Sequence, residues 1–564
     1  MKFSNFVYKR PDYPTVATKF DQLISQFNTA TAVAEQNEVI EKINVLRSDY
    51  QTMFSIASTR HNIDTTDDTY TVEQSYVDKE RPAFSGLTNR FYKALVNSKY
   101  RQELEKTWGK QLFVIADLSL KSFDDSIIGY LQKENQLVSR YIKLLASAEI
   151  PFEGEVRNLS GFGKFFNSKD RAMRIKVREA YYGFFTEHQH TLDDIFDQLV
   201  HLRHEMAQAL GFKNFVEMAY ARMKRSDYTA EDVAHYRKMM EKHVVPLATK
   251  LRKRQQNRLG LEDFYHFDES LEFNSGNPTP KGDAEWIVAN AEKMYEELSP
   301  ETNEFFQFMK SNELMDLVNR KGKAGGGYCT VFKKYKSPFI FSNFNGTSGD
   351  IKVLTHEAGH AFQAYSSIDL ITPEYNFPTM EAAEIHSMSM ELLTWDWMHY
   401  FFEEDTDKFK FSHLSRSITF LPYGVAVDEF QHFVYENPNI SPEERNKEWR
   451  RIEQKYMPHR VYNGIGYLES GRFWQQQRHI YKSPFYYIDY TLAQVCALQF
   501  WKRYNENPEK AMEDYTRLCK AGGSQSFLNL VKLAKLRSPF EETTLVEVMA
   551  EAEAWLEKVD DTLL

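Results

Sequence analysis

The sequence has few cysteines and no long hydrophobic run. Its three cysteines, Cys329, Cys496 and Cys519, lie far apart among 564 residues. This spacing excludes a disulfide framework and a zinc site built from thiolates, and it favours a reducing compartment. The N-terminal residues lead into no apolar segment, and nowhere do about 18 apolar residues follow one another. We therefore expect a soluble, cytoplasmic protein.

The chain also lacks an excess of positive charge. It has 70 Lys and Arg against 80 Asp and Glu, which gives a formal net charge of -10. Nucleic acid is therefore not an expected partner, because no net positive field would displace counterions from a phosphate backbone. Hydrophobic residues make up 42% of the chain and aromatic residues 15%, enough apolar material for a large core, so global disorder is excluded.

Helical periodicity dominates the hydrophobic pattern. Apolar residues recur at spacings of three and four in 185–210 and 284–308, which predicts an amphipathic helix in each. Short aromatic and β-branched runs at 328–332 and 338–344 predict a small sheet. The sequence thus predicts a mainly α fold with a small β-sheet before residue 350.

Glycine and proline punctuate residues 151–166, and they predict a division of the chain into two regions. We place an N-terminal helical region at 1–167 and a second, larger region at 168–564.

The pentapeptide His356-Glu357-Ala358-Gly359-His360 lies near the middle of the larger region. In metallopeptidases with this pattern, two histidines one helical turn apart bind Zn²⁺, and the glutamate between them acts as a base. With Asp350 as the predicted N-cap, His356 and His360 lie opposite the apolar stripe of the helix and face a cleft. The alternative is a pair of ordinary core histidines.

A catalytic zinc site also needs a third protein ligand and an open position for water. A second helix is predicted from about Thr379, and Glu384 is our third ligand. Its rival, Glu381, falls in the first turn, where a carboxylate can simply complement the helix dipole. Glu391 lies on the same face as Glu384 and could accept the free ring N–H of a ligating histidine, or lie at the surface. His386 points the other way and is expected to be a core or surface residue.

Residues 456–490 are rich in tyrosine, which suggests phenols lining a wet cavity: Tyr456, Tyr462, Tyr467, Tyr481, Tyr486, Tyr487 and Tyr490. Ser483-Pro484 predicts an N-cap and first helical position, with Tyr487 and Tyr490 on one face and His479 just upstream. Amide hydrolysis creates an oxyanion, and these three side chains are candidate hydrogen-bond donors to it. Ordinary packing for each tyrosine, and a surface position for His479, are the alternatives.

Three segments, 350–361, 383–391 and 479–490, contain these motifs. Together they resemble the thimet oligopeptidase and oligoendopeptidase F family of zinc peptidases, and within it the Pz-peptidase type. The resemblance implies one zinc ion per chain, with His356, His360 and Glu384 as its ligands. It also implies that Glu357 is the catalytic base. The transition-state donors that it implies are His479, Tyr490 and Tyr487.

The family resemblance also implies a helical, two-lobed body around a deep channel that admits short peptides. We expect an endopeptidase that hydrolyses internal bonds of short oligopeptides, including Pro- and Gly-containing, collagen-derived ones, by glutamate-assisted attack of a zinc-activated water. The alternatives are a zinc exopeptidase of carboxypeptidase or dipeptidyl type, and a non-catalytic helical peptide-binding protein with a structural zinc.

Overall fold

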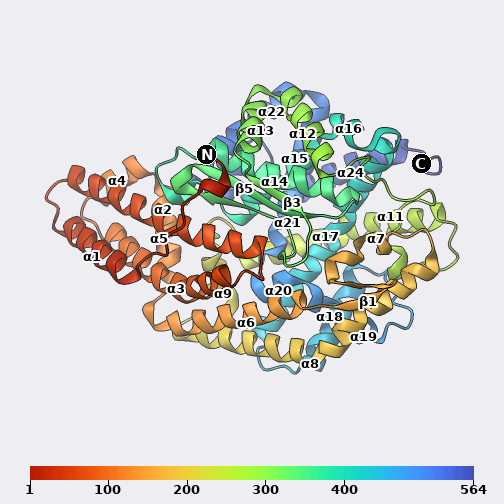
Figure 1. Cartoon of the computed structure of the whole chain (residues 1–564), viewed down its shortest axis with the longest axis horizontal. Coiled ribbons are helices and arrows are strands. Elements are labelled where there is room, and N and C mark those ends of the chain that lie inside the picture. Colours follow the sequence, from red (N-terminus) through yellow and green to blue (C-terminus); the bar gives the residue numbers. More distant parts are fainter.

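The computed structural model describes all 564 residues, and most of them are helical. The first part of the chain contains α1 (Tyr13–Thr29), α2 (Val33–Ile63), α3 (Asp68–Val96), α4 (Arg101–Trp108), α5 (Lys110–Ser122), α6 (Ile128–Ala146), α7 (Gly163–Phe166) and α8 (Arg171–Ala209). Helices α1 to α5 form a bundle at one end of the molecule (Figure 1, red to orange) and bury a core of their own.

The remaining helices surround a second, much larger core. They are α9 (Phe215–Arg222), α10 (Ala230–Met239), α11 (Val245–Arg258), α12 (Ala284–Leu298), α13 (Pro300–Ser311), α14 (Ser348–Ser366), α15 (Met380–Leu393), α16 (His399–Phe402), α17 (Thr406–Glu436), α18 (Pro442–Tyr456), α19 (Gly466–Glu469), α20 (Arg478–Lys482), α21 (Tyr487–Glu506), α22 (Pro508–Ala521), α23 (Phe527–Leu533) and α24 (Glu542–Lys558). Helix α15 packs against both α14 and α21 and is buried on all sides.

Two small sheets complete the fold. Strands β1 (Ile150–Phe152) and β2 (Glu155–Arg157) form an antiparallel hairpin. The other sheet has the order β3-β5-β4, with β3 (Met315–Val318) parallel and β4 (Tyr328–Phe332) antiparallel to the central β5 (Ser337–Phe344). Because β5 leads directly into α14, the sheet holds the N-terminal end of that helix. The predicted mainly α fold with a small sheet is confirmed.

One predicted helix is interrupted. Residues 185–210 lie almost entirely within the long α8, but 284–308 form α12 and α13 instead of one helix. Helix α12 ends at Leu298, and the Ser299 hydroxyl caps α13 by accepting a hydrogen bond from Thr302 N at 3.1 Å. Pro300 follows in the first turn, where its missing N–H costs nothing. The prediction of a single helix over 284–308 is therefore wrong.

The loop between α14 and α15 is tied to the N-terminal bundle. Arg47 of α2 and Tyr92 of α3 both donate to the buried carboxylate of Glu374 in this loop. The neighbouring Tyr375 hydroxyl donates to Trp108 O at 2.7 Å and accepts from Leu112 N at 2.9 Å. The bundle thereby fixes the connection between the two helices that form the site described below.

Two histidines with buried ring nitrogens should make stability depend on pH. Neither ring nitrogen of His266 or His459 forms a hydrogen bond, and desolvation lowers the pKa of each to about 4. An unfolded histidine titrates near pH ~6.5. Between these values the unfolded chain binds more protons, so the free energy of unfolding should fall as the pH falls, by about 1.4 kcal/mol per histidine and pH unit.

Urea unfolding at pH 7 and pH 5 measures this loss. The double variant His266→Gln, His459→Gln should lose less stability between the two pH values than the unchanged protein. An equal loss in both proteins would show that these histidines do not titrate as described.

Candidate metal centre and active site

Helices α14 and α15 approach each other closely at Gly359. A methyl group on this residue would lie 2.6 Å from the carbonyl oxygen of His386, so only glycine allows the contact. Helix α14 begins at Ser348 and is capped by the Thr347 hydroxyl, not by Asp350 as predicted. Asp350 lies in the first turn instead, where its carboxylate accepts from the backbone N–H groups before the helix.

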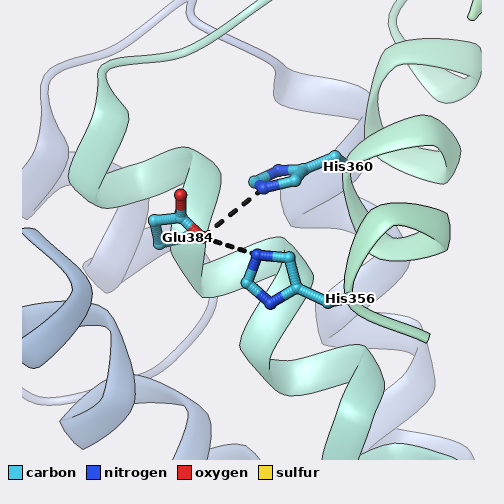
Figure 2. A group of neighbouring side chains, drawn as sticks. All are labelled: His356, His360 and Glu384. Atoms are coloured by element: carbon cyan, nitrogen blue, oxygen red, sulfur yellow. Dashed lines mark ion pairs between the residues drawn. The ribbon is translucent and has the colours of Figure 1, made fainter. Parts of the chain in front are cut away.

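The close approach brings two histidines of α14 opposite one glutamate of α15. Nε2 of His356 lies 3.2 Å, and Nε2 of His360 3.4 Å, from Oε2 of Glu384. Figure 2 shows both rings projecting toward this carboxylate. Two ligand atoms about 2.1 Å from a tetrahedral ion lie about 3.4 Å apart. The arrangement of these three side chains therefore fits Zn²⁺.

Glu391 orients one of the two imidazoles. Its Oε1 lies 2.6 Å from His356 Nδ1, which leaves Nε2 of that ring facing Glu384. Its Oε2 accepts from His413 Nε2 at 2.9 Å, and the Trp395 indole donates to His413 Nδ1. Burial opposes ionisation of Glu391, but the charge of Lys352 and these hydrogen bonds hold its pKa below its ordinary range.

A tyrosine holds the other oxygen of Glu384. The Tyr486 hydroxyl donates to Oε1, so Oε2 stays directed at the imidazoles. Burial alone would raise the pKa of Glu384. The charges of His360 and His356 and their hydrogen bonds overcome this effect and hold the pKa well below its ordinary value. Glu384 is therefore a carboxylate at neutral pH and suited to bind a cation.

Glu357 lies close enough to His356 and His360 for their charges to act on its pKa, and its Oε2 has no hydrogen-bond partner. The side chain is buried, and burial raises its pKa despite the nearby imidazoles. Gly327 at the end of the glycine run leaves room beside it, since a methyl group there would lie 3.4 Å from Oε1. A buried carboxylate with a raised pKa and a free oxygen is suited to exchange a proton near neutral pH.

His479 and Tyr490 form a second polar group, with the Tyr490 hydroxyl 3.3 Å from His479 Nε2. Desolvation, with the charge of Lys482, lowers the pKa of His479 to about 4, so the ring is neutral at pH 7. The Tyr423 hydroxyl donates to Gln477 Oε1 at 2.8 Å, and Gln477 Nε2 donates to His479 Nδ1 at 2.7 Å. The remaining proton of the ring is therefore on Nε2, where it can be donated.

The start of the tyrosine-rich helix differs from the prediction. Helix α21 begins at Tyr487, not at Pro484, because Phe485 has a φ of 66° and breaks the chain direction. The backbone N–H of Phe485 donates to Gln431 Oε1 at 2.8 Å, and Gln431 lies on another helix, α17. His479 lies within the short helix α20, upstream of this turn as expected. The Tyr487 ring packs on His479 at 5.1 Å, and its hydroxyl forms no hydrogen bond.

The tyrosines of 456–490 do not all line a cavity. Four of them are buried in the core: Tyr456, Tyr462, Tyr467 and Tyr481. The expectation is wrong for three of these, whereas Tyr467 also lines a cavity beside α8. Their hydroxyls are satisfied inside the protein by a carboxylate, an amide or a backbone carbonyl. Aromatic packing, with a polar group satisfied at one end, accounts for their density.

Glu381, the rival third ligand, and His386 both lie outside the cluster. Glu381 is in the first turn of α15 and completely buried, and neither carboxylate oxygen forms a hydrogen bond. His386 lies in the core, which was one of the two positions expected for it. Desolvation lowers its pKa to about 4. Neither joins the three side chains that face one another.

Several side chains of the site are not singled out by the sequence, among them Tyr486, Gln477, Tyr423, His413 and Ser387, whose hydroxyl donates to Glu384 Oε2 at 2.7 Å. The sequence places Tyr486 in the tyrosine-rich segment but indicates no role for it. Gln477 is two residues from His479, whereas Tyr423 and His413 lie on α17, far away in the sequence. No local pattern distinguishes the last two from other residues of an amphipathic helix.

The site has the composition of a metallopeptidase: two histidines of α14 and one glutamate of α15 face one another, and α14 also carries Glu357. Residues 3–123 match the family model described as Peptidase M3 N-terminal domain, and residues 165–285 and 286–549 match the one described as Peptidase family M3. The chain belongs to peptidase family M3 and is a metalloendopeptidase.

Individual relatives agree with this family. An oligoendopeptidase F homolog from Borreliella burgdorferi is 24% identical over 70% of this chain and 69% of its own length. Among solved structures, Pz peptidase A with an inhibitor is 56% identical with a TM-score of 0.98, and both chains are covered completely. A putative oligoendopeptidase F from Bacillus anthracis is 54% identical with a TM-score of 0.94, over 100% of this chain and 99% of that one. No helix of the present chain has the length and apolar character needed to cross a membrane.

Proposed function

We propose that this chain is a zinc-dependent oligopeptidase that cleaves internal bonds of short peptides. His356, His360 and Glu384 would hold one Zn²⁺, because their three facing atoms have the spacing and chemistry that this ion requires. A bound Zn²⁺ would lower the pKa of a water molecule and polarise the peptide carbonyl. Two observations carry this proposal: the three facing ligand atoms, and the buried Glu357 next to His356 in the chain, whose Oε2 has no hydrogen-bond partner.

Glu357 is the proposed base. It takes a proton from the attacking water and returns it to the departing amine, so it must be ionised at the start and regain its charge at the end. Burial raises the pKa of Glu357 toward neutral pH, and this makes both proton transfers easier. Neither oxygen of Glu357 is needed to bind the metal, because Glu384 supplies the carboxylate oxygen that faces the imidazoles.

His479 and Tyr490 are the proposed donors to the oxyanion. Charge develops on the carbonyl oxygen only as the tetrahedral state forms, so hydrogen bonds to it lower the barrier more than they strengthen substrate binding. The proton on His479 Nε2 is held in place by Gln477, a positioning residue. Tyr487 packs on the imidazole and would keep its plane fixed.

Replacing Tyr490 by phenylalanine should lower kcat about 100-fold with little change in KM, because the lost hydrogen bond acts mainly in the transition state. Tyr487→Phe is the matched control, since it removes a hydroxyl with no partner from the same helix face. We expect that variant to keep most of its activity. Steady-state kinetics on one quenched fluorescent peptide measures both, and an unchanged kcat in Tyr490→Phe would remove this residue from the mechanism.

Peptides of graded length, blocked at both termini, test the proposed function. Mass spectrometry should find internal cuts that a zinc chelator abolishes. An exopeptidase would stall on the blocked ends, and a peptide-binding protein with structural zinc would cleave nothing. We include Pro- and Gly-containing, collagen-like sequences, because one structurally similar protein is named a Pz peptidase.

The division at residue 167 and a cytoplasmic location belong to the same proposal. Few cysteines and no disulfide support the reducing compartment. The separate core of the N-terminal bundle supports two regions. Limited proteolysis that cuts first within 151–166 would agree with the proposed boundary.

A further inference from the structure

A cavity of about 340 Å³ lies behind the proposed oxyanion donors. Tyr423 and Phe420 of α17 form part of its wall. The Tyr423 hydroxyl contacts Gln477, which contacts His479, so one side chain separates the cavity wall from that imidazole. The Phe420 ring also lies 5.7 Å from the ring of Tyr487. The cavity therefore adjoins the site where the peptide bond would be cleaved.

Arginine dominates the charged lining of this cavity. Four arginines face two carboxylates there, Arg178, Arg252, Arg416 and Arg460 against Glu269 and Glu272. This gives the lining a positive charge although the whole chain has a formal net charge of -10. A cleft of one sign raises the local concentration of an oppositely charged ligand.

Three of the arginines already share the two carboxylates. Arg460 forms a two-pronged pair with Glu269, at 3.0 and 2.7 Å, and Arg252 lies 4.0 Å from the same residue. Arg416 Nε lies 3.0 Å from Glu272. These pairs leave no carboxylate in the lining for the fourth arginine.

Arg178 of α8 is that fourth arginine, and it has no carboxylate within 4 Å. It is 8% exposed, stacks on Phe166, and makes one hydrogen bond, from Nη2 to Ser270 Oγ at 2.6 Å. Its Nε has no hydrogen-bond partner, and the same is true of Arg252 Nε. A buried guanidinium with unused donors is costly, and a carboxylate is the group whose geometry satisfies it best.

We propose that this cavity is a subsite for an acidic side chain, aspartate or glutamate, of the peptide substrate. The inference rests on the proposed peptidase function. Arg178 would bind the carboxylate from the buried end of the cavity, and Arg416, whose side chain is 43% exposed, would attract it at the rim. The cavity volume is within the range of sites that enclose a small ligand group.

A glutamate scan tests the subsite. Quenched fluorescent peptides with amidated C-termini carry one glutamate, moved along an otherwise neutral sequence, and each has a glutamine counterpart. At one position we expect kcat/KM to be about tenfold higher for glutamate than for glutamine, because a charge-assisted hydrogen bond is lost with the amide. This ratio should decrease in high salt.

Enzyme variants assign the effect to the cavity. Arg178→Gln should bring the glutamate-to-glutamine ratio at that position to about one, and Arg416→Gln, which lies at the rim and should fold normally, should lower it. Arg140→Gln is the matched control, because Arg140 is an exposed arginine of α6 that is paired with Asp194 away from the cavity. That variant should keep the full ratio.

Three results would overturn the inference. They are a ratio near one at every position in the unchanged enzyme, a ratio that neither Arg178→Gln nor Arg416→Gln alters, and a ratio that the Arg140→Gln control lowers as much as Arg178→Gln does. If none of the peptides is cleaved, the proposed peptidase function fails instead, so the two failures are distinguishable.

Discussion

Glu357→Gln should abolish nearly all peptide hydrolysis, about 1000-fold in kcat, while the protein still binds one zinc ion. Glutamine has the same shape as glutamate but cannot take a proton from water, and general-base catalysis contributes about 10²–10⁴-fold to such reactions. Metal binding should persist, because the ligand atoms come from the three other side chains. Single-turnover kinetics with elemental analysis of the same sample measures both quantities.

Glu381→Gln is the matched control for this variant. Glu381 is likewise a buried glutamate without a hydrogen-bond partner, on the neighbouring helix, and desolvation raises its pKa to about 7. Glutamine mimics the protonated side chain there, so we expect activity to persist. Full activity in Glu357→Gln would contradict the assignment of the base.

Glu384→Gln should weaken zinc binding more than about 100-fold. Residues that only orient a ligand typically contribute 10–100-fold to metal affinity, and loss of a ligand itself should exceed that. Glu391→Gln provides the comparison, because Glu391 contacts His356 Nδ1 rather than the facing ligand atoms, and we expect its effect to stay within that range. Competition with a chromophoric chelator measures both affinities without relying on activity.

Activity should return to Glu384→Gln only in a large excess of zinc, if at all. An unchanged zinc affinity in this variant would mean that the carboxylate is not a ligand. Equal losses in Glu384→Gln and Glu391→Gln would mean that their roles are not distinguished as the geometry suggests.

The parts of the site that could be predicted from the sequence are those set by helical periodicity. His356, Glu357 and His360 are neighbours on successive turns of one helix, and Glu384 lies on the inner face of the next. The spacing within each helix therefore determines where these side chains point. The small sheet was also predictable, because its two longer strands are short apolar runs directly before α14.

The parts that could not be predicted depend on distant segments. The turn at Phe485, which sets where α21 begins and so where Tyr486 points, is held by Gln431 of α17. The tautomer of His479 depends on Gln477 and, through it, on Tyr423. These contacts form only when the helices pack.

The break between α12 and α13 is a different case. Ser299-Pro300 is a recognisable helix start, so the local sequence contained the signal. The continuous apolar periodicity of 284–308 hid it, because both helices bury their apolar faces in the same core.

Elemental analysis of active, purified protein tests the central claim most directly. We predict one zinc ion per chain, loss of peptide hydrolysis in proportion to the zinc that a chelator removes, and recovery when one equivalent is returned. Full activity in protein that contains no zinc would contradict the account.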